Sequence, residues 1–204
     1  MDWNIENEYF EKGVKLICGT DEAGRGPLCG NVVAGACILP PGIELPYLND
    51  SKKLTEKRRD ALYELITENA VSWAVAEATP AEIDEYNILN ASQLAMRRAV
   101  KKLSPVPELV LVDGNVAREF TLPAVTLVGG DAISPSIAAA SILAKVTRDR
   151  ELYELDKRYP TLGLAKHKGY PTKAHYAALK AYIAGNGSIP DIYRRCFLKN
   201  LDEK

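Results

Sequence analysis

Short apolar or alternating runs recur along this chain, and they are separated by longer stretches with helical periodicity. The short runs predict five strands, at Val14–Thr20, Asn31–Leu39, Val71–Ala78, Glu108–Val112 and Ala124–Val128. The longer stretches predict helices over Thr55–Asn69, Ser134–Tyr159 and Thr172–Ala184. Two adjacent strands followed by alternating helices and strands are typical of a mixed sheet with helices packed on it, an α/β fold.

Helix-start signals refine these boundaries. The run Thr79-Pro80-Ala81-Glu82 combines an N-cap, a first-turn proline and a capping-box glutamate. We expect a second helix start at Asn90. Ser134 and Pro135 open the long helix in the same manner, and Leu62, Leu65 and Ile66 form the expected apolar side of Thr55–Asn69.

The first strand leads into adjacent carboxylates and a glycine turn. Asp21 and Glu22 follow the apolar run, and Gly24, Arg25 and Gly26 come directly after them. We expect the two acids at the end of the strand and the glycines in the turn that leads to the next strand. Charges this close to buried strands are costly unless a cation or hydrogen bonds compensate for them. The pattern therefore indicates a metal site beside an anion-binding turn.

Two further acids fall just past predicted strands. Asp113 follows Glu108–Val112 and Asp131 follows Ala124–Val128. With Asp21 and Glu22 they offer only oxygen ligands, which suit Mg²⁺ or Mn²⁺ better than Zn²⁺, and two such ions would support phosphodiester hydrolysis. Taken singly, Asp113 and Asp131 are more often a helix cap or a surface turn, and spacing alone does not assemble the four acids into one site.

Composition and charge narrow the setting. The chain has 204 residues, 47% of them hydrophobic, and no repeat or long linker, so we expect a single domain over residues 1–204. Residues 145–204 hold 13 basic and 7 acidic residues, whereas residues 1–144 hold 13 basic and 20 acidic ones. The basic C-terminal part is compatible with a phosphate-binding surface, although solvated helices give a similar asymmetry. The acidic start lacks a secretory signal, and the four cysteines show no metal-ligand spacing, so we expect reduced thiols and a cytoplasmic location.

Five motifs in order resemble those of type 2 ribonucleases H, specifically bacterial ribonuclease HII. The resemblance spans roughly Ile17 to Phe197, and the segments that carry it are Asp21–Pro27, Asp50–Leu54, Asp113–Asn115, Asp131 with Ser136–Asp149, and His167–Tyr170. The related ribonuclease HIII carries an additional N-terminal substrate-binding domain. About twenty residues precede Asp21 here, which favours ribonuclease HII.

The resemblance implies a ribonuclease H-like fold, a mixed five-stranded sheet flanked by helices with a helical C-terminal extension from about residue 160. It implies that Asp21, Glu22, Asp113 and Asp131 are the catalytic, metal-binding carboxylates. It also implies that Gly24, Arg25 and Gly26 read the ribose 2′-hydroxyl, while Tyr170 packs on the following deoxyribose. Substrate contacts are expected for the basic residues of the matching motifs, namely Lys52, Lys53, Lys145 and Arg148. For Arg148 an ion pair on the helix surface is an equal alternative, and for His167 a hydrogen-bonded structural role is favoured.

The implied activity is hydrolysis of the phosphodiester 5′ of ribonucleotides by a two-metal-ion mechanism with Mg²⁺ or Mn²⁺. The substrates would be RNA–DNA hybrids and duplex DNA with single embedded ribonucleotides, and the protein would act as a monomer without a membrane partner. The segment Tyr193–Phe197 departs from the His-Arg-Arg-x-Ser-Phe-like pattern of the family, and Leu162 and Leu164 stand where aromatic residues are usual. These departures put a role of the tail in gripping substrate in doubt.

Two other functions compete with this one. A catalytically silent binder of hybrid duplexes gains nothing from four acids beside phosphates. A two-metal exonuclease of similar fold typically carries an Asp-x-Glu pattern, whereas Asp21 and Glu22 are adjacent.

Overall fold

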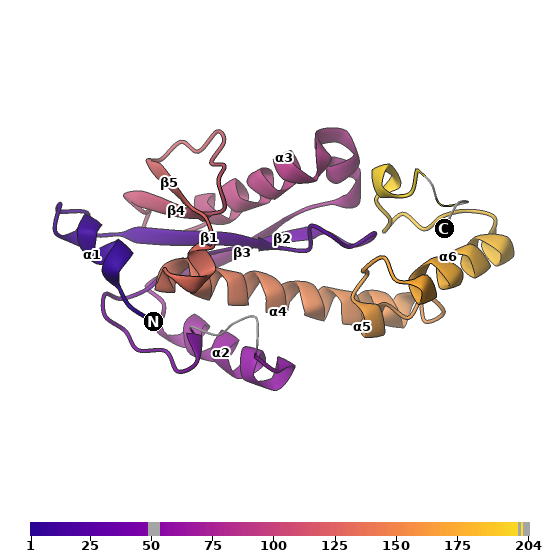
Figure 1. The fold of residues 1–204 in the computed structure, drawn as a ribbon, viewed down its shortest axis with the longest axis horizontal. Helices are drawn as coiled ribbons and strands as arrows, with labels where there is room; N and C mark the ends of the chain where they lie inside the picture. Colours follow the sequence, from indigo (N-terminus) through magenta and orange to yellow (C-terminus); the bar gives the residue numbers. More distant parts are fainter. Residues whose placement is uncertain (49–53, 200, 202–204) are drawn as a thin grey trace.

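The computed structural model describes residues 1–48, 54–199 and 201, and its centre is a mixed five-stranded sheet (Figure 1). The strand order is β3-β2-β1-β4-β5. Neighbours β3, β2 and β1 are antiparallel, while β4 and β5 run parallel to β1. The strands are β1 (Ile17–Ala23), β2 (Val32–Ile38), β3 (Ser72–Ala78), β4 (Leu109–Asp113) and β5 (Ala124–Leu127). The predicted mixed sheet is therefore confirmed.

Helices cover both faces of the sheet. In Figure 1, α3 (Pro80–Lys101) lies on one face and α4 (Pro135–Arg158) on the other, with α2 (Glu56–Asn69) outside α4. Alternating strand residues supply the two cores, so that Ala36 packs on the α3 side and Cys37 on the α4 side. Leu62 and Ile66 of α2 are buried as expected, but Leu65 is 37% exposed, because α2 presents only one narrow stripe to α4.

Two glycines allow α4 to lie close to the sheet. A Cβ atom on Gly19 of β1 would lie 2.1 Å from the main-chain carbon of Ser136, and one on Gly35 of β2 would lie 2.2 Å from the carbonyl oxygen of Ala140. No side chain fits at either position without moving the helix. This close packing puts the middle of α4 directly beneath the end of β1.

The helix caps follow the predictions with one shift. Thr79 and Glu82 form the reciprocal capping box of α3, and Ser134 caps α4. The second helix start lies at Asn87 rather than Asn90. Asn87 has φ +66° and its side chain accepts a hydrogen bond from the Asn90 N–H at 3.1 Å, so Asn90 is the third residue of the new segment.

The N-terminal helix α1 (Asn4–Phe10) supports the start of α4. Glu6 of α1 is fully buried, and its carboxylate accepts hydrogen bonds from the Ser134 hydroxyl at 2.6 Å and from the Ser136 N–H at 3.2 Å. A carboxylate at this position also offsets the positive end of the helix dipole. This short helix was not among the predicted elements, although Ile5, Tyr9 and Phe10 pack on the core.

A helical extension continues from the far end of α4 and contains α5 (Leu164–His167), α6 (Lys173–Asn186) and the short 3-10 helix η3 (Arg195–Phe197) (Figure 1). Leu162 and Leu164, the two positions that depart from the family pattern, are buried in the apolar cluster of this extension. Helix α6 begins after its N-cap Thr172, as predicted.

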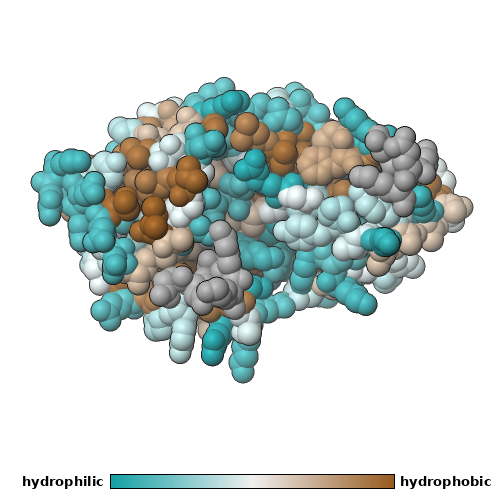
Figure 2. Space-filling view, in the orientation of Figure 1, coloured by the Kyte–Doolittle hydropathy of each residue, from teal (hydrophilic) through white to brown (hydrophobic). Residues whose placement is uncertain are grey.

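Hydrophobic and hydrophilic side chains gather in separate areas of the surface. Figure 2 shows a hydrophobic patch over the region of β4 and β5 and mainly hydrophilic side chains across the middle of the same face. None of the helices in the described part of the chain is long and apolar enough to cross a membrane. Cys18, Cys29 and Cys37 are buried free thiols, and Cys196 is a partly exposed one.

Candidate active site

Strand β1 carries Asp21 and Glu22 within its last three residues. The strand runs three residues beyond the predicted end at Thr20, because Asp21, Glu22 and Ala23 keep pairing with β2. The acids therefore lie in the strand, not past it. Asp21 is buried, and its carboxylate accepts a hydrogen bond from the Glu22 N–H at 2.7 Å.

Asp113 and Asp131 approach from the neighbouring strands. Asp113 is the last residue of β4, and its carboxylate accepts a hydrogen bond from the Gly130 N–H at 2.7 Å. Asp131 lies in the 3-10 helix η2 (Gly130–Ala132), between β5 and α4, and is also buried. Gly129 makes this turn with φ +66°. The parallel order β1-β4-β5 thus brings the three chain segments to one edge of the sheet.

One cavity of about 400 Å³ collects these residues. Its lining comprises Asp21, Glu22, Ala23, Gly24, Arg59, Asp113, Asp131, Ser141, Ile142, Lys145, Arg148 and Tyr170. All four acids, Gly24, Lys145, Arg148 and Tyr170 of the sequence prediction are therefore together. Arg25 and Gly26 lie beside the cavity on the exposed turn. Lys52 and Lys53 lie outside the described residues.

Burial and mutual repulsion dominate the electrostatics of this cavity. Burial raises the pKa of Asp21 well above its usual value, and the charges of Glu22 and Asp113 raise it further. Hydrogen bonds from Ser141 and from the Glu22 N–H oppose that shift. Burial also raises the pKa of Glu22, although Arg25 partly offsets it through an ion pair at 3.2 Å. Without a cation, ionisation of Asp21 and Glu22 therefore costs more free energy in this cavity than it does in water.

The donor set fits a hard divalent cation. Four carboxylates and no nitrogen or sulfur ligand line the cavity, and a cation would relieve the repulsion between Asp21 and its neighbours. Among the described residues, however, no group of three or more acids, histidines or cysteines is already arranged to hold a metal ion. One oxygen of Glu22 contacts Arg25 and one oxygen of Asp113 accepts from the Gly130 N–H, which leaves the second oxygen of each carboxylate for a cation.

The glycine turn fits closely between Arg148 and Tyr170. Gly24 has φ +99°, and a Cβ atom there would lie 2.0 Å from the Nε of Arg148. A Cβ atom on Gly26 would lie 3.3 Å from the Tyr170 ring, which is itself half-exposed. The structure thus places the turn and the aromatic side chain side by side, although Gly26 and Tyr170 are 144 positions apart in the sequence.

Arg148 is a buried residue of α4 and not a surface one. It is 1% exposed, and its guanidinium donates to the main-chain oxygens of Cys29 at 3.3 Å and Lys168 at 3.4 Å. The alternative of an ion pair on the helix surface was wrong, because α4 is covered at this point by the glycine turn and by the segment that carries Tyr170. A phosphate contact of Arg148 stays a prediction.

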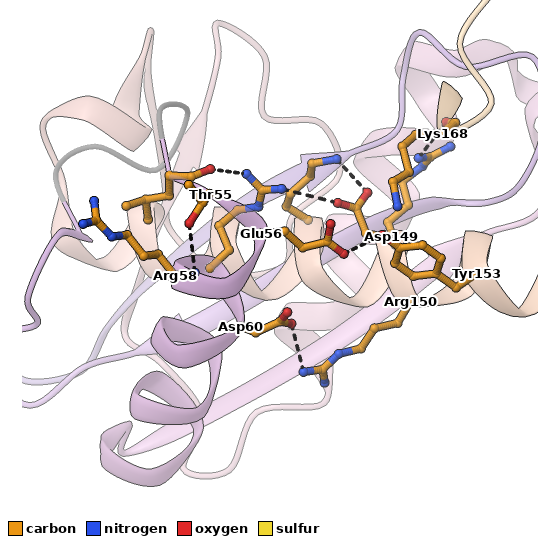
Figure 3. A network of polar contacts seen from close by, with 12 residues as sticks. Thr55, Glu56, Arg58, Asp60, Asp149, Arg150, Tyr153 and Lys168 are labelled. Atoms are coloured by element: carbon orange, nitrogen blue, oxygen red, sulfur yellow. Dashed lines mark hydrogen bonds and ion pairs between the residues drawn. The ribbon is translucent and has the colours of Figure 1, made fainter. Parts of the chain in front are cut away.

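A polar network between α2 and α4 holds the basic side of the cavity (Figure 3). Lys145 forms an ion pair with Asp149 at 2.6 Å, and Arg59 approaches the same carboxylate at 3.8 Å. Tyr153 donates a hydrogen bond to Glu56 at 2.6 Å, and the ammonium of Lys168 lies 3.4 Å from the Tyr153 ring centre. These contacts join the helices to the turn before Tyr170.

Two polar side chains of the cavity were missed by the sequence prediction. Arg59 is one of several basic residues in α2, and Ser141 lies in the small-residue run of α4. Only the packing of these helices on each other and on β1 distinguishes them. His167, by contrast, has the structural role that was favoured, since its ring nitrogens contact the Leu162 carbonyl oxygen at 2.9 Å and the Gly169 N–H at 3.2 Å.

Comparisons of the sequence with known proteins point to one family. Residues 18–200 match the family model described as ribonuclease HII. A ribonuclease HII of an Azoarcus species is 56% identical over 184 residues, which cover 90% of this chain and 88% of that protein. Another from Shewanella amazonensis is 58% identical over 166 residues, 81% of each chain.

Solved structures give the same result. The ribonuclease H2 of Pyrococcus horikoshii superposes with a TM-score of 0.80 at 28% identity, over 93% of this chain and 98% of that one. The likeness therefore includes the sheet, its helices and the C-terminal extension. Family match, sequence identity and fold lead to one conclusion, that this chain belongs to the ribonuclease HII family of ribonuclease H-type endonucleases.

Proposed function

We propose that this enzyme hydrolyses the phosphodiester on the 5′ side of ribonucleotides, both in RNA–DNA hybrids and at single ribonucleotides embedded in duplex DNA. One observation carries the proposal: the glycine turn and Tyr170 lie side by side at a cavity lined by four carboxylates. A group that reads the sugar and a group that cuts the adjacent phosphate would then act on neighbouring nucleotides.

The sugar-reading part of the proposal rests on the backbone at Gly24 and Gly26. Glycine lets the main chain approach a sugar closely, and the 2′-hydroxyl is the group that distinguishes RNA from DNA at a given position. The half-exposed ring of Tyr170 would lie against the next sugar, where a hydroxyl would not fit. Together they would select the step from RNA to DNA.

The cutting part rests on Asp21, Glu22, Asp113 and Asp131, which would hold Mg²⁺ or Mn²⁺. Bound divalent ions would supply Lewis acidity at the scissile phosphate. Lys145, Arg25 and Arg148 would add positive charge for the neighbouring phosphates, and the ion pair of Lys145 with Asp149 would keep its ammonium at the cavity. Repulsion among the ionised acids would favour the binding of cations to the site. The bound cations would then allow a negatively charged phosphate to enter.

A panel of duplexes tests this function against its rivals. All-DNA, single-ribonucleotide and RNA–DNA hybrid duplexes, each end-labelled, are incubated with Mg²⁺, with Mn²⁺ and with a chelator. We expect internal cutting of the two ribonucleotide-containing duplexes with either metal and none with the chelator. Binding without any cutting would support the silent binder, and ladders from one end that include the DNA duplex would support the exonuclease.

The oligomeric state and the location of the protein complete the proposed function. We infer a single-domain monomer that acts in the cytoplasm. Light scattering on the purified protein in solution should give a mass near 22.4 kDa, whereas a mass of twice that value would contradict the monomer.

A further inference from the structure

Arg194, in the segment that departs from the family pattern, is a fully buried arginine beneath the glycine turn. It is 0% exposed, so it lies out of reach of any nucleic acid. Its guanidinium donates five hydrogen bonds of 2.8–3.2 Å, all to main-chain carbonyl oxygens of residues 25–31. The four acceptors are Arg25, Pro27, Gly30 and Asn31, with Gly30 accepting twice.

These bonds use the whole guanidinium. Its five N–H groups are fixed in one plane, and each has an acceptor in the loop. Burial, together with the charge of Arg148, lowers the pKa of Arg194 to about 10, so it stays protonated at neutral pH. A buried charge is costly and is often retained for the geometry that it imposes. Here that geometry is the path of the loop.

The bonds to Arg25 and Pro27 also set the direction of the N–H groups that follow. In a trans peptide the C=O of one residue and the N–H of the next point in opposite directions. The Pro27 carbonyl points to Arg194, and the Leu28 N–H accordingly points the other way and donates to the Gly169 carbonyl oxygen at 2.8 Å. By the same rule, the Arg25 carbonyl directs the N–H of the exposed Gly26 away from Arg194.

The segment around Arg194 is itself firmly docked. Its own N–H donates to the Leu28 carbonyl oxygen at 3.0 Å, and the Gly30 N–H donates to the Ile192 carbonyl oxygen at 2.9 Å. Tyr193 contacts the buried His175 ring through its hydroxyl at 2.7 Å. Arg194 is therefore held by the C-terminal extension and by Leu28 and Gly30, which lie outside the Gly24–Gly26 turn.

We propose that Arg194 is a positioning residue that sets the peptide plane between Arg25 and Gly26 in the Gly24–Gly26 turn, and thereby the preference for a ribose 2′-hydroxyl, without touching substrate. The inference rests on the function proposed above. It gives the atypical Tyr193–Phe197 segment a role in selectivity that requires no contact between Arg194 and nucleic acid.

Binding preference provides the test, because a general loss of folded protein would weaken binding to all duplexes equally. In an Asp113→Asn background, which keeps the substrates intact, affinities for a single-ribonucleotide duplex and its all-DNA twin are measured by fluorescence anisotropy with Mg²⁺. Arg194→Lys is compared with Arg195→Lys. The neighbouring Arg195 is a matched control, since its side chain donates to the Ile189 carbonyl oxygen and not to the turn.

We expect Arg194→Lys to reduce the preference for the ribonucleotide duplex by about five-fold, the effect of one misplaced hydrogen bond. Its affinity for the all-DNA twin should stay the same, and Arg195→Lys should keep the full preference. A folded Arg194→Lys protein that retains the preference, or that loses affinity for both duplexes alike, would overturn the inference alone. Equal binding of both duplexes by the Asp113→Asn parent would overturn the proposed function, and the inference with it.

A second substitution at Arg194 keeps the test possible if Arg194→Lys unfolds. If Arg194→Lys melts below the assay temperature, Arg194→Gln, which keeps two N–H donors without the charge, is measured in the cold with the same expected result. Failure of both variants to fold would assign Arg194 to stability only and overturn the inference.

Discussion

At the scale of single residues, the carboxylates of the cavity lower the stability of the metal-free protein, and the same carboxylates would bind a cation. Asp21 is buried beside two other acids, and its ionised form is disfavoured for that reason. A cation in the cavity would remove the penalty. The same charge that weakens the metal-free protein is thus the one that would bind the ion.

Asp21→Asn should therefore stabilise the metal-free protein. We expect a higher Tm than that of the unchanged protein in chelator, because the amide carries no charge to bury. Addition of Mg²⁺ or Mn²⁺ should raise the Tm of the unchanged protein and have little effect on the variant. Thermal melts with and without metal check this, and a lower Tm of the variant in chelator would refute it.

Asp113→Asn separates chemistry from folding. The asparagine side chain keeps an oxygen that can accept from the Gly130 N–H, so the turn before Asp131 should persist. We expect kcat on a single-ribonucleotide duplex to fall by about 100-fold or more, with duplex affinity largely unchanged, since charge at the reacting phosphate is lost. Turnover equal to that of the unchanged protein would sink the role proposed for Asp113.

The sequence alone predicted those site residues that stand next to one another in the chain. Asp21, Glu22 and the glycine turn stand in one short run, and the pattern of that run points to their use. Arg59, Ser141 and Arg194 could not be found in this way, because their neighbours are defined only when α2, α4 and the C-terminal extension pack. The hydrogen-bonding of Arg194, for instance, joins residues more than 160 positions apart.

At the scale of elements, the distance between α4 and the sheet decides where the cavity lies. Gly19 and Gly35 face α4 without side chains, and the helix backbone occupies the space. The strands and the long helix were predictable from their periodicity and from the Ser134 cap. The seven-residue helix α1 was not, because so short a helix depends on tertiary contacts, here the buried contact of Glu6 with Ser134 and the packing of Ile5, Tyr9 and Phe10 on the core.

Gly35→Ala tests that packing. The added methyl group would collide with the Ala140 carbonyl, so we expect a loss of about 2 kcal/mol in the free energy of unfolding, or a Tm lower by roughly 4–8 °C. Gly185→Ala in α6 is the matched control, since nothing lies within 4 Å of its Cβ position. That control should be more stable by about 0.5–1 kcal/mol. Equal Tm values for the two variants would contradict the close packing of α4.

At the scale of the whole molecule, the C-terminal extension is joined to the catalytic sheet by buried polar groups. Arg194 contacts the turn after β1, and Tyr193 contacts His175 of α6. Burial, with a smaller contribution from His167, lowers the pKa of His175 to about 4. The histidine is therefore neutral in the folded protein at neutral and mildly acidic pH.

Acid should weaken the extension through His175. Between the usual pKa of 6.5 and about 4, the unfolded chain binds a proton that the folded one does not, so stability is full above pH 6.5 and falls as the pH decreases. Protonation of His175 in the unfolded chain thus lowers the free energy of unfolding by about 3 kcal/mol at pH 4. Denaturant unfolding of the unchanged protein and of His175→Gln at several pH values isolates this contribution. Parallel pH profiles of the two proteins would contradict the assignment.

The position of the cut tests the proposed function most directly, because it requires the Gly24–Gly26 turn and Tyr170 to act together with the four carboxylates. A duplex with one ribonucleotide is labelled at the 5′ end of the strand that carries it, incubated with Mg²⁺ or Mn²⁺, and resolved at single-nucleotide resolution. We expect one product, cut at the phosphate on the 5′ side of the ribonucleotide, and an uncut all-DNA twin. Cutting on the 3′ side, at scattered positions or in the all-DNA duplex would contradict it.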